Sequence, residues 1–133
     1  KVAELASSIA KDRRARDMLE IYQRKYLIEP GLVADGRDMG TKVFSEANIK
    51  FFLTASVEKR AERRLNQLKD QGISANLPNL IQKLLLRDKA DTERSISPLM
   101  PAEDAIIIDT SNIDALEVFN IVMKQIRENI KNI

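Results

Sequence analysis

The chain has 133 residues, of which 44% are hydrophobic and 32% charged, and its formal net charge is +2. This composition is typical of one globular domain or a large part of one, and it excludes an intrinsically disordered chain. The absence of cysteine and histidine excludes disulfides, thiolate metal sites and the commonest catalytic base. Balanced charge and the lack of an apolar run of roughly 20 residues argue against a nucleic-acid or membrane partner, so we expect a cytoplasmic protein.

The first half of the chain predicts helices followed by strands. Residues 2–10 and 12–26 have helical patterns, and the dipeptide Pro30-Gly31 favours a turn. An apolar run then predicts a buried strand over residues 31–35. A loop leads to a second predicted strand over residues 49–55.

The middle of the chain predicts two helices. Ser56 is a suitable N-cap for a helix that runs to about Gln71, and Gly72 would end it. A polar connector over residues 73–78 leads to a second helix over residues 79–93.

The end of the chain predicts a third strand over residues 105–109 and a final helix that begins at a capping box, Ser111-x-x-Asp114. One face of this helix is apolar, and we expect it to lie in the core; its residues are Leu116, Phe119, Met123, Ile126 and Ile130. Strands separated by helices predict an α/β fold with a parallel sheet flanked by helices.

The charged turn after the first predicted strand, Asp35-Gly36-Arg37-Asp38, is the most informative segment. The carboxyl ends of strands are where open α/β sheets bind ligands. Arg37 offers a planar fork that matches phosphate or carboxylate. On these residues alone, a solvated turn is an equally good interpretation.

Two further charged clusters lie on predicted helices. Arg87, Asp91 and Arg94 are spaced by four and three residues, which places them on one helix face. An exposed ion pair is the simplest interpretation of that spacing. Arg60 and Arg64 are also four apart and would project together, and a solvated basic helix is the simplest interpretation there.

These segments resemble, in the same order and over nearly the whole chain, the signatures of bacterial cytidylate kinases, which phosphorylate CMP and dCMP with ATP. The matching segments are GLVADGRDMGT, ANIKFFLTAS, EKRAERR, RDKADTERSISPL and PAEDAIIIDTS. The glycine-rich phosphate loop with which those kinases begin is not in this sequence. The resemblance therefore implies the carboxyl-terminal portion of a P-loop nucleoside monophosphate kinase, with a parallel sheet and a helical lid.

The resemblance implies a CMP site built from hydrogen-bonding side chains. Cytosine presents an amine that donates and N3 and O2 that accept, so carboxylates, hydroxyls and arginines suit it. The resemblance assigns Arg37 to the phosphate and Arg87 and Asp91 to the sugar. It assigns Ser7, Arg16, Asp38 and Arg94 to the base. The CMP-binding residues that it implies are Ser7, Arg16, Arg37, Asp38, Arg87, Asp91 and Arg94.

The resemblance also implies an ATP site and a lid. Arg60, Arg63 and Arg64 would clamp the ATP phosphates, and Asp35 would lie near Mg²⁺ through a water molecule. The lid would span about residues 69–79. Phosphoryl transfer depends on positioning and charge neutralisation, so the implied catalytic residues are arginines: Arg37, Arg60, Arg64 and Arg87.

The resemblance divides the chain into four parts. They are CMP-binding helices (1–30), core strands (31–55), the lid with its flanking helices (56–94), and a C-terminal strand and helix (95–133). The parent enzyme would be a monomer in pyrimidine metabolism, with CMP or dCMP and ATP as its small-molecule partners.

The missing phosphate loop has two expected consequences. In the family its strand lies between the strands predicted at residues 31–35 and 49–55, so the chain alone is expected to be marginal, dimeric through its sheet edges, or rearranged. We also expect the chain alone to be catalytically inactive. Two alternatives remain on the sequence: a kinase for another monophosphate such as UMP or AMP, and a non-catalytic nucleotide-binding module.

Overall fold

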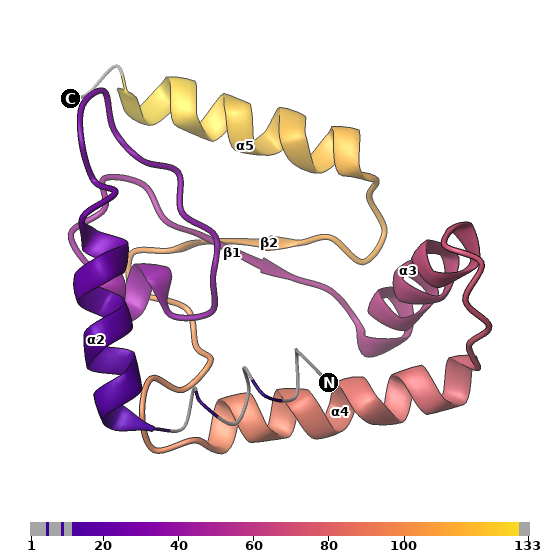
Figure 1. The fold of residues 1–133 in the computed structure, drawn as a ribbon. Coiled ribbons are helices and arrows are strands. Elements are labelled where there is room, and N and C mark those ends of the chain that lie inside the picture. The colour runs from indigo at the N-terminus through magenta and orange to yellow at the C-terminus, as the bar shows by residue number, and fades with distance from the viewer. Residues whose placement is uncertain (1–4, 6–8, 10–11, 131–133) are drawn as a thin grey trace.

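The computed structural model describes Leu5, Ile9 and residues 12–130. Its elements are α2 (Arg13–Arg24), η1 (Met39–Val43), β1 (Phe51–Thr54), α3 (Val57–Asp70), α4 (Leu77–Glu93), β2 (Ile106–Asp109) and α5 (Ala115–Ile130). The two strands lie in the middle of the molecule and the helices are arranged around them (Figure 1). The α/β class is confirmed. The helix expected over residues 2–10 falls on a segment of which only Leu5 and Ile9 are described.

The described sheet has two parallel strands. β1 pairs with β2 in a register that runs from Phe51 opposite Ile106 to Thr54 opposite Asp109. Parallel neighbours need a long crossover connection, which α3 and α4 supply. The second and third predicted strands and their parallel arrangement are therefore confirmed.

The first predicted strand is wrong. Residues 31–35 form no strand, and Val33 is 99% exposed. An extended segment becomes a strand only where a neighbour takes up its backbone hydrogen bonds, and the described sheet consists of β1 and β2 alone. An apolar run such as Leu32-Val33-Ala34 is therefore not sufficient to form a strand here.

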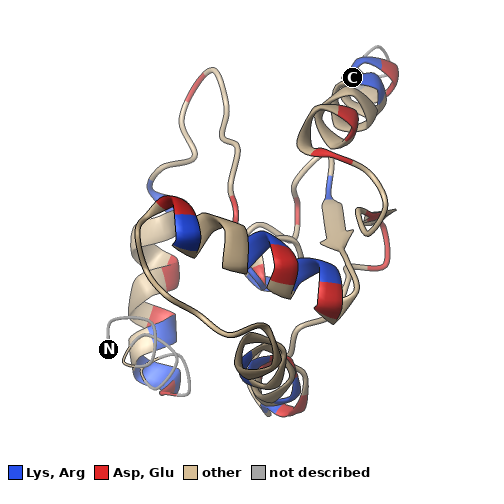
Figure 2. Cartoon of the chain, turned by 90° about the vertical axis from the view of Figure 1, so that its right-hand side faces the viewer, with Lys and Arg blue, Asp and Glu red and all other residues tan. Residues whose placement is uncertain are grey.

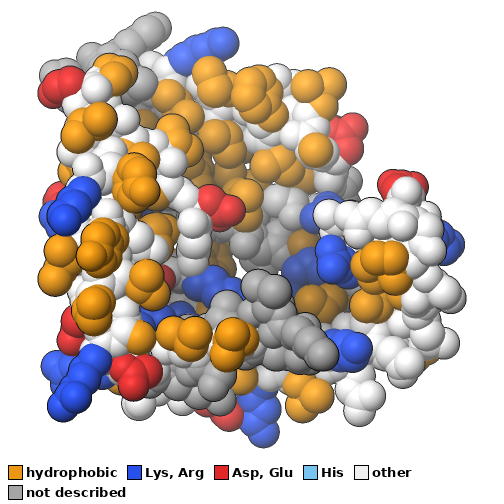
Figure 3. All heavy atoms as spheres, in the orientation of Figure 1, with side chains coloured by type: hydrophobic (Ala, Val, Ile, Leu, Met, Phe, Trp, Pro, Cys, Tyr) orange, Lys and Arg blue, Asp and Glu red, His pale blue; other side chains and the backbone are white. Residues whose placement is uncertain are grey.

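The apolar core of the described residues is small. Its buried apolar side chains are Val43, Phe44, Ala61 and Ile108. Hydrophobic side chains are spread over the face of the molecule shown in Figure 3. On α5, Leu116 is 66% and Phe119 is 58% exposed. The expectation that the apolar face of α5 lies in the core is therefore wrong for Leu116 and Phe119, whereas Met123 and Ile126 are half-buried. An amphipathic helix buries its stripe only where another element packs against it.

The ends of α3 confirm the sequence prediction. The Ser56 hydroxyl accepts a hydrogen bond from the Lys59 backbone N–H at 3.3 Å. Gly72 has a φ of +71°, and the N–H of Ile73 donates to the Leu68 carbonyl at 2.8 Å. A polar N-cap and a left-handed glycine are local signals, so they could be recognised in the sequence.

The start of α5 differs from the prediction, which placed the cap at Ser111. The Asp114 carboxylate accepts from the Glu117 N–H at 2.8 Å, and the Glu117 carboxylate accepts from the Asp114 N–H at 2.9 Å. The capping box is therefore Asp114-x-x-Glu117. The Ser111 hydroxyl instead donates to Asp109 at 2.6 Å and accepts from the Ser56 N–H at 2.9 Å, which ties together the ends of the two strands.

We expect Asp114→Ala to lower the free energy of unfolding by about 1 kcal/mol, because it removes the acceptor for the N–H of Glu117. Urea denaturation followed by circular dichroism measures this change. Asn112→Ala, an exposed change beside the cap, is the control and should stay within about 0.5 kcal/mol of the unchanged chain. Equal stability of the two variants would show that the cap does not stabilise α5.

Candidate functional site

Charged side chains from three distant segments converge on one region of the molecule. α2 supplies one of them, the turn before η1 supplies two, and the C-terminal end of α4 supplies the rest. They are Arg16, Arg37, Asp38, Arg87, Asp91 and Arg94. Acidic and basic residues are otherwise interleaved along the helices (Figure 2).

Asp91 is the centre of this charged cluster. It is only 7% exposed. One of its carboxylate oxygens bonds Arg37 and lies 3.8 Å from Nε of Arg87, and the other lies 3.7 Å from Nη1 of Arg94. A buried carboxylate is tolerated only when charged partners surround it. The predicted common face of these α4 residues is confirmed, but Asp91 is buried and not part of an exposed surface pair.

Asp38 forms a second buried pair, with Arg16. The Asp38 residue is 8% exposed, and the two side chains bond each other directly. The backbone carbonyl of Asp38 also accepts from the N–H groups of Lys42 at 2.9 Å and Val43 at 3.2 Å, at the start of η1. The π-helical turn therefore holds Asp38 against α2.

Arg94 interacts electrostatically with both buried aspartates, Asp91 and Asp38. Its Nε donates to the Ser97 carbonyl, whereas its buried Nη2 finds no hydrogen-bond partner among the residues described. Burial lowers the pKa of Arg94, and the positive charge of Arg16 lowers it further. A buried donor left without a partner costs about 1–3 kcal/mol. The cluster has more arginines than aspartates, so an anionic or oxygen-rich ligand would complete it.

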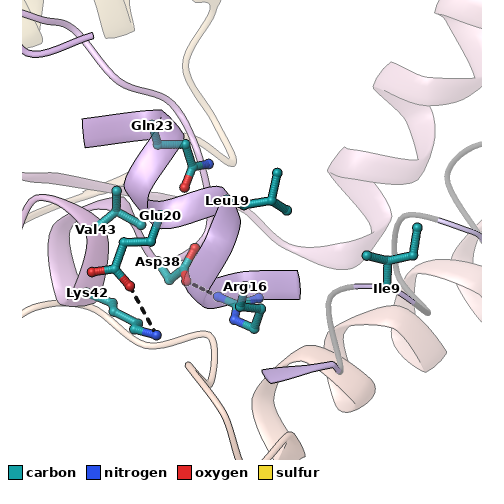
Figure 4. A pocket seen from close by; sticks show the side chains of 8 residues that line it. All are labelled: Ile9, Arg16, Leu19, Glu20, Gln23, Asp38, Lys42 and Val43. Carbon is teal, nitrogen blue, oxygen red and sulfur yellow. Dashed lines mark hydrogen bonds and ion pairs between the residues drawn. The ribbon is translucent and has the colours of Figure 1, made fainter. Parts of the chain in front are cut away.

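A cavity of about 260 Å³ adjoins the Arg16–Asp38 pair (Figure 4). Leu19 and Val43 supply apolar walls, and Glu20 forms an ion pair with Lys42 at 3.2 Å on its rim. The remaining lining residues are Ile9 and Gln23. A cavity of about 150 Å³ already holds a benzene ring, so this one can accept a single-ring heterocycle.

The arginines of α3 do not project together as the sequence predicted. Arg60 donates to both oxygens of Asp88, at 3.0 and 2.6 Å, and these bonds raise its pKa. Arg63 donates to the hydroxyl and carbonyl of Thr110. Arg64 donates to Gln67 at 2.5 Å on the exposed side of the helix. Arg63 and Arg64 are both exposed residues, but the guanidinium of Arg63 is engaged by Thr110 and by the Ile113 carbonyl.

Sequence reasoning missed Asp88, Glu20 and Lys42. Their partners lie on other elements, and a single helix pattern contains no signal for such a pairing. Ser7, which the resemblance placed near the base, lies outside the described residues.

Asp35 is exposed, and the described residues contain no group of three or more histidines, cysteines, aspartates or glutamates that could hold a metal. Mg²⁺ at nucleotide sites is commonly held by one or two carboxylates plus phosphate oxygens. A single carboxylate such as Asp35 fits that arrangement.

Among the described helices, none is both long and apolar enough to cross a membrane.

The combination of an arginine-rich cluster, a ring-sized cavity and the DGRD turn is accompanied by a match to a family model. The model described as cytidylate kinase matches residues 1–128. The chain belongs to the cytidylate kinase family. Members of this family are P-loop nucleoside monophosphate kinases with ATP as phosphate donor, and the small parallel sheet with its flanking helices agrees with that fold class.

Several curated cytidylate kinases are similar to the chain. The cytidylate kinase of Shewanella sediminis is 48% identical over 128 residues, which cover 96% of the chain and 56% of that protein. The one from Shewanella frigidimarina is 49% identical over 125 residues, covering 94% and 55%. The one from Colwellia psychrerythraea is 48% identical over 122 residues, covering 92% and 54%. The chain thus spans about half the length of these curated cytidylate kinases.

Proposed function

We propose that this chain supplies the CMP site and the lid of a cytidylate kinase, which transfers the γ-phosphate of ATP to CMP or dCMP and yields CDP or dCDP. The observation that supports this most directly is the convergence of Arg37, Arg87 and Arg94 on Asp91, beside the Arg16–Asp38 pair and its cavity. The cluster has an excess of positive charge and a ring-sized space next to it, which are the two features that a nucleoside monophosphate needs.

Base recognition is assigned to the cavity beside the Arg16–Asp38 pair, together with Arg94. The Asp38 carboxylate would accept from the exocyclic amine of cytosine, and Arg16 and Arg94 would donate to N3 and O2. Ser7 would add a hydroxyl near the base. Uracil reverses the pattern at positions 3 and 4 and would leave buried groups unpaired, which is how a site built on hydrogen bonds rejects an analogue.

Sugar and phosphate binding is assigned to the charged cluster centred on Asp91. Arg37 would bind the CMP phosphate, and Arg87 and Asp91 would bind the sugar hydroxyls. An oxygen of that phosphate attacks the γ-phosphorus of ATP in line, and ADP leaves. Arginine side chains stabilise the charge that spreads over the transferred group.

The donor side is assigned to α3 and the lid. Arg60, Arg63 and Arg64 are the candidates for the ATP phosphates, and the lid lies around Gly72. Mg²⁺, held by phosphate oxygens and through water by Asp35, would add charge neutralisation. We assign the complete reaction to a longer protein, because these 133 residues contain no glycine-rich phosphate loop. We propose that this longer protein is a cytoplasmic monomer that acts in pyrimidine metabolism.

Calorimetric titration of the chain with CMP, UMP and AMP tests this proposal. We expect CMP to bind about 100-fold more tightly than UMP. Lys124→Gln, on the exposed side of α5, is the matched control and should leave both affinities unchanged. Tighter binding of UMP or AMP would point to a different monophosphate kinase. Absence of binding by all three nucleotides would contradict the assignment of the substrate site to this chain.

A further inference from the structure

Arg60 uses its guanidinium to join three elements. Its Nε donates to the carbonyl of Ala55, just after β1, at 3.1 Å. Its Nη1 and Nη2 donate to the two oxygens of Asp88 on α4, at 3.0 and 2.6 Å. Arg60 itself lies in the first turn of α3, so one side chain ties together β1, α3 and α4.

The contact between Arg60 and Asp88 lies at the base of the hairpin that α3 and α4 form. α3 and α4 lie side by side and are connected at their far end by the segment that contains Gly72 (Figure 1). The Arg60–Asp88 contact is at the opposite end, close to the sheet. Both side chains are about one-third exposed, at 34% and 29%, so solvent screens the pair only in part.

The geometry of the pair leaves Arg60 poorly placed to grip a phosphate. A phosphate or carboxylate is bound by two N–H groups of an arginine at once, and Arg60 already donates its Nη1 and Nη2 groups to Asp88. A phosphate could take this fork only by displacing Asp88. Arg64, one helical turn further along α3, donates to Gln67 and lies on the exposed side.

We propose that Arg60 and Asp88 form a pin at the base of the α3–α4 hairpin. Arg60 is then a positioning residue for phosphoryl transfer, and Arg64 is the α3 arginine that meets the phosphates of a nucleoside triphosphate. The pin rests on the observed bonds, whereas the identification of the triphosphate as ATP rests on the proposed function.

The same helix connects the pin to the substrate cluster. Asp88 and Asp91 are three residues apart on α4, so both lie on neighbouring positions of one helix surface. Asp88 engages α3, while Asp91 engages Arg37. A pinned α4 therefore fixes the orientation of the lid helices relative to the cluster that is assigned to CMP.

Hydrogen–deuterium exchange of the 133-residue chain tests the pin. Asp88→Asn should accelerate exchange across α3 by about tenfold, since local opening becomes easier, and Asp88→Glu should restore part of the protection because it keeps the carboxylate. Glu93→Gln is the matched control, since Glu93 forms only an exposed ion pair with Lys89 on the same helix, at 4.0 Å. Exchange in Asp88→Asn equal to that in Glu93→Gln would overturn the pin.

Titration with ATP tests the division of roles between the two arginines. We expect Arg64→Gln to weaken ATP binding about tenfold with unchanged exchange in α3, and Asp88→Asn to weaken ATP binding together with faster exchange. Tighter ATP binding by Asp88→Asn would overturn the positioning role, because Asp88 would then compete with phosphate for Arg60. Failure of the unchanged chain to bind ATP would overturn both the donor-side assignment and the positioning role, while the exchange experiment decides the pin independently.

Discussion

Replacing Asp91 by alanine is expected to lower the free energy of unfolding by about 3 kcal/mol, the range found when one partner of a buried ion pair is removed. Asp91 is 7% exposed, and its carboxylate pairs with Arg37 and Arg94. Without it, Arg94 keeps a buried positive charge whose pKa burial already lowers. Urea denaturation measured by circular dichroism gives the change directly.

Two further variants make the Asp91 result interpretable. Glu93→Gln removes an exposed pair on the same helix and should cost no more than about 0.5 kcal/mol. Asp91→Asn keeps the shape and a hydrogen-bonding oxygen, so it should fall between the two and reports on the charge if the alanine variant is unfolded. A loss below about 1 kcal/mol in Asp91→Ala would show that the cluster does not contribute to stability.

The second large effect concerns the base. Asp38→Asn is expected to weaken CMP binding about 100-fold and to leave UMP binding unchanged or stronger, so that the preference for CMP disappears. A hydrogen bond to a charged group contributes about 1.5–3 kcal/mol, and an amide can donate to the O4 of uracil where a carboxylate cannot. The measurement is calorimetric titration of the variant with both nucleotides.

Glu20→Gln is the control for this experiment, because Glu20 lines the same cavity but pairs with Lys42 at its rim. Its CMP and UMP affinities should change by less than about threefold. An equal loss of CMP and UMP affinity in Asp38→Asn would assign Asp38 to the support of Arg16 and not to reading the base.

Helices and strands whose ends or composition are set by neighbouring residues could be predicted from the sequence. The cap at Ser56 and the left-handed Gly72 delimit α3, and both signals act within one turn of the helix. The strand β1 was also recognisable, since it consists of two aromatic residues, a leucine and a β-branched threonine.

Elements that need a distant partner were not predictable in the same way. Residues 31–35 have the composition of a strand but no neighbouring strand in the described sheet. The stripe of α5 has the correct period, yet Leu116 and Phe119 remain exposed. In each case the pattern defines a capacity to pair or pack, and the presence of a partner decides the outcome.

The candidate site shows the same division. The sequence by itself determined the family resemblance and the shared face of Arg87, Asp91 and Arg94, because the period of a helix sets which side chains are neighbours. Only the tertiary structure decided that Arg37 reaches Asp91 and that Arg60 is bound to Asp88. Helix periodicity acts over a few residues, whereas ion pairs between elements depend on how the whole chain brings separate segments together.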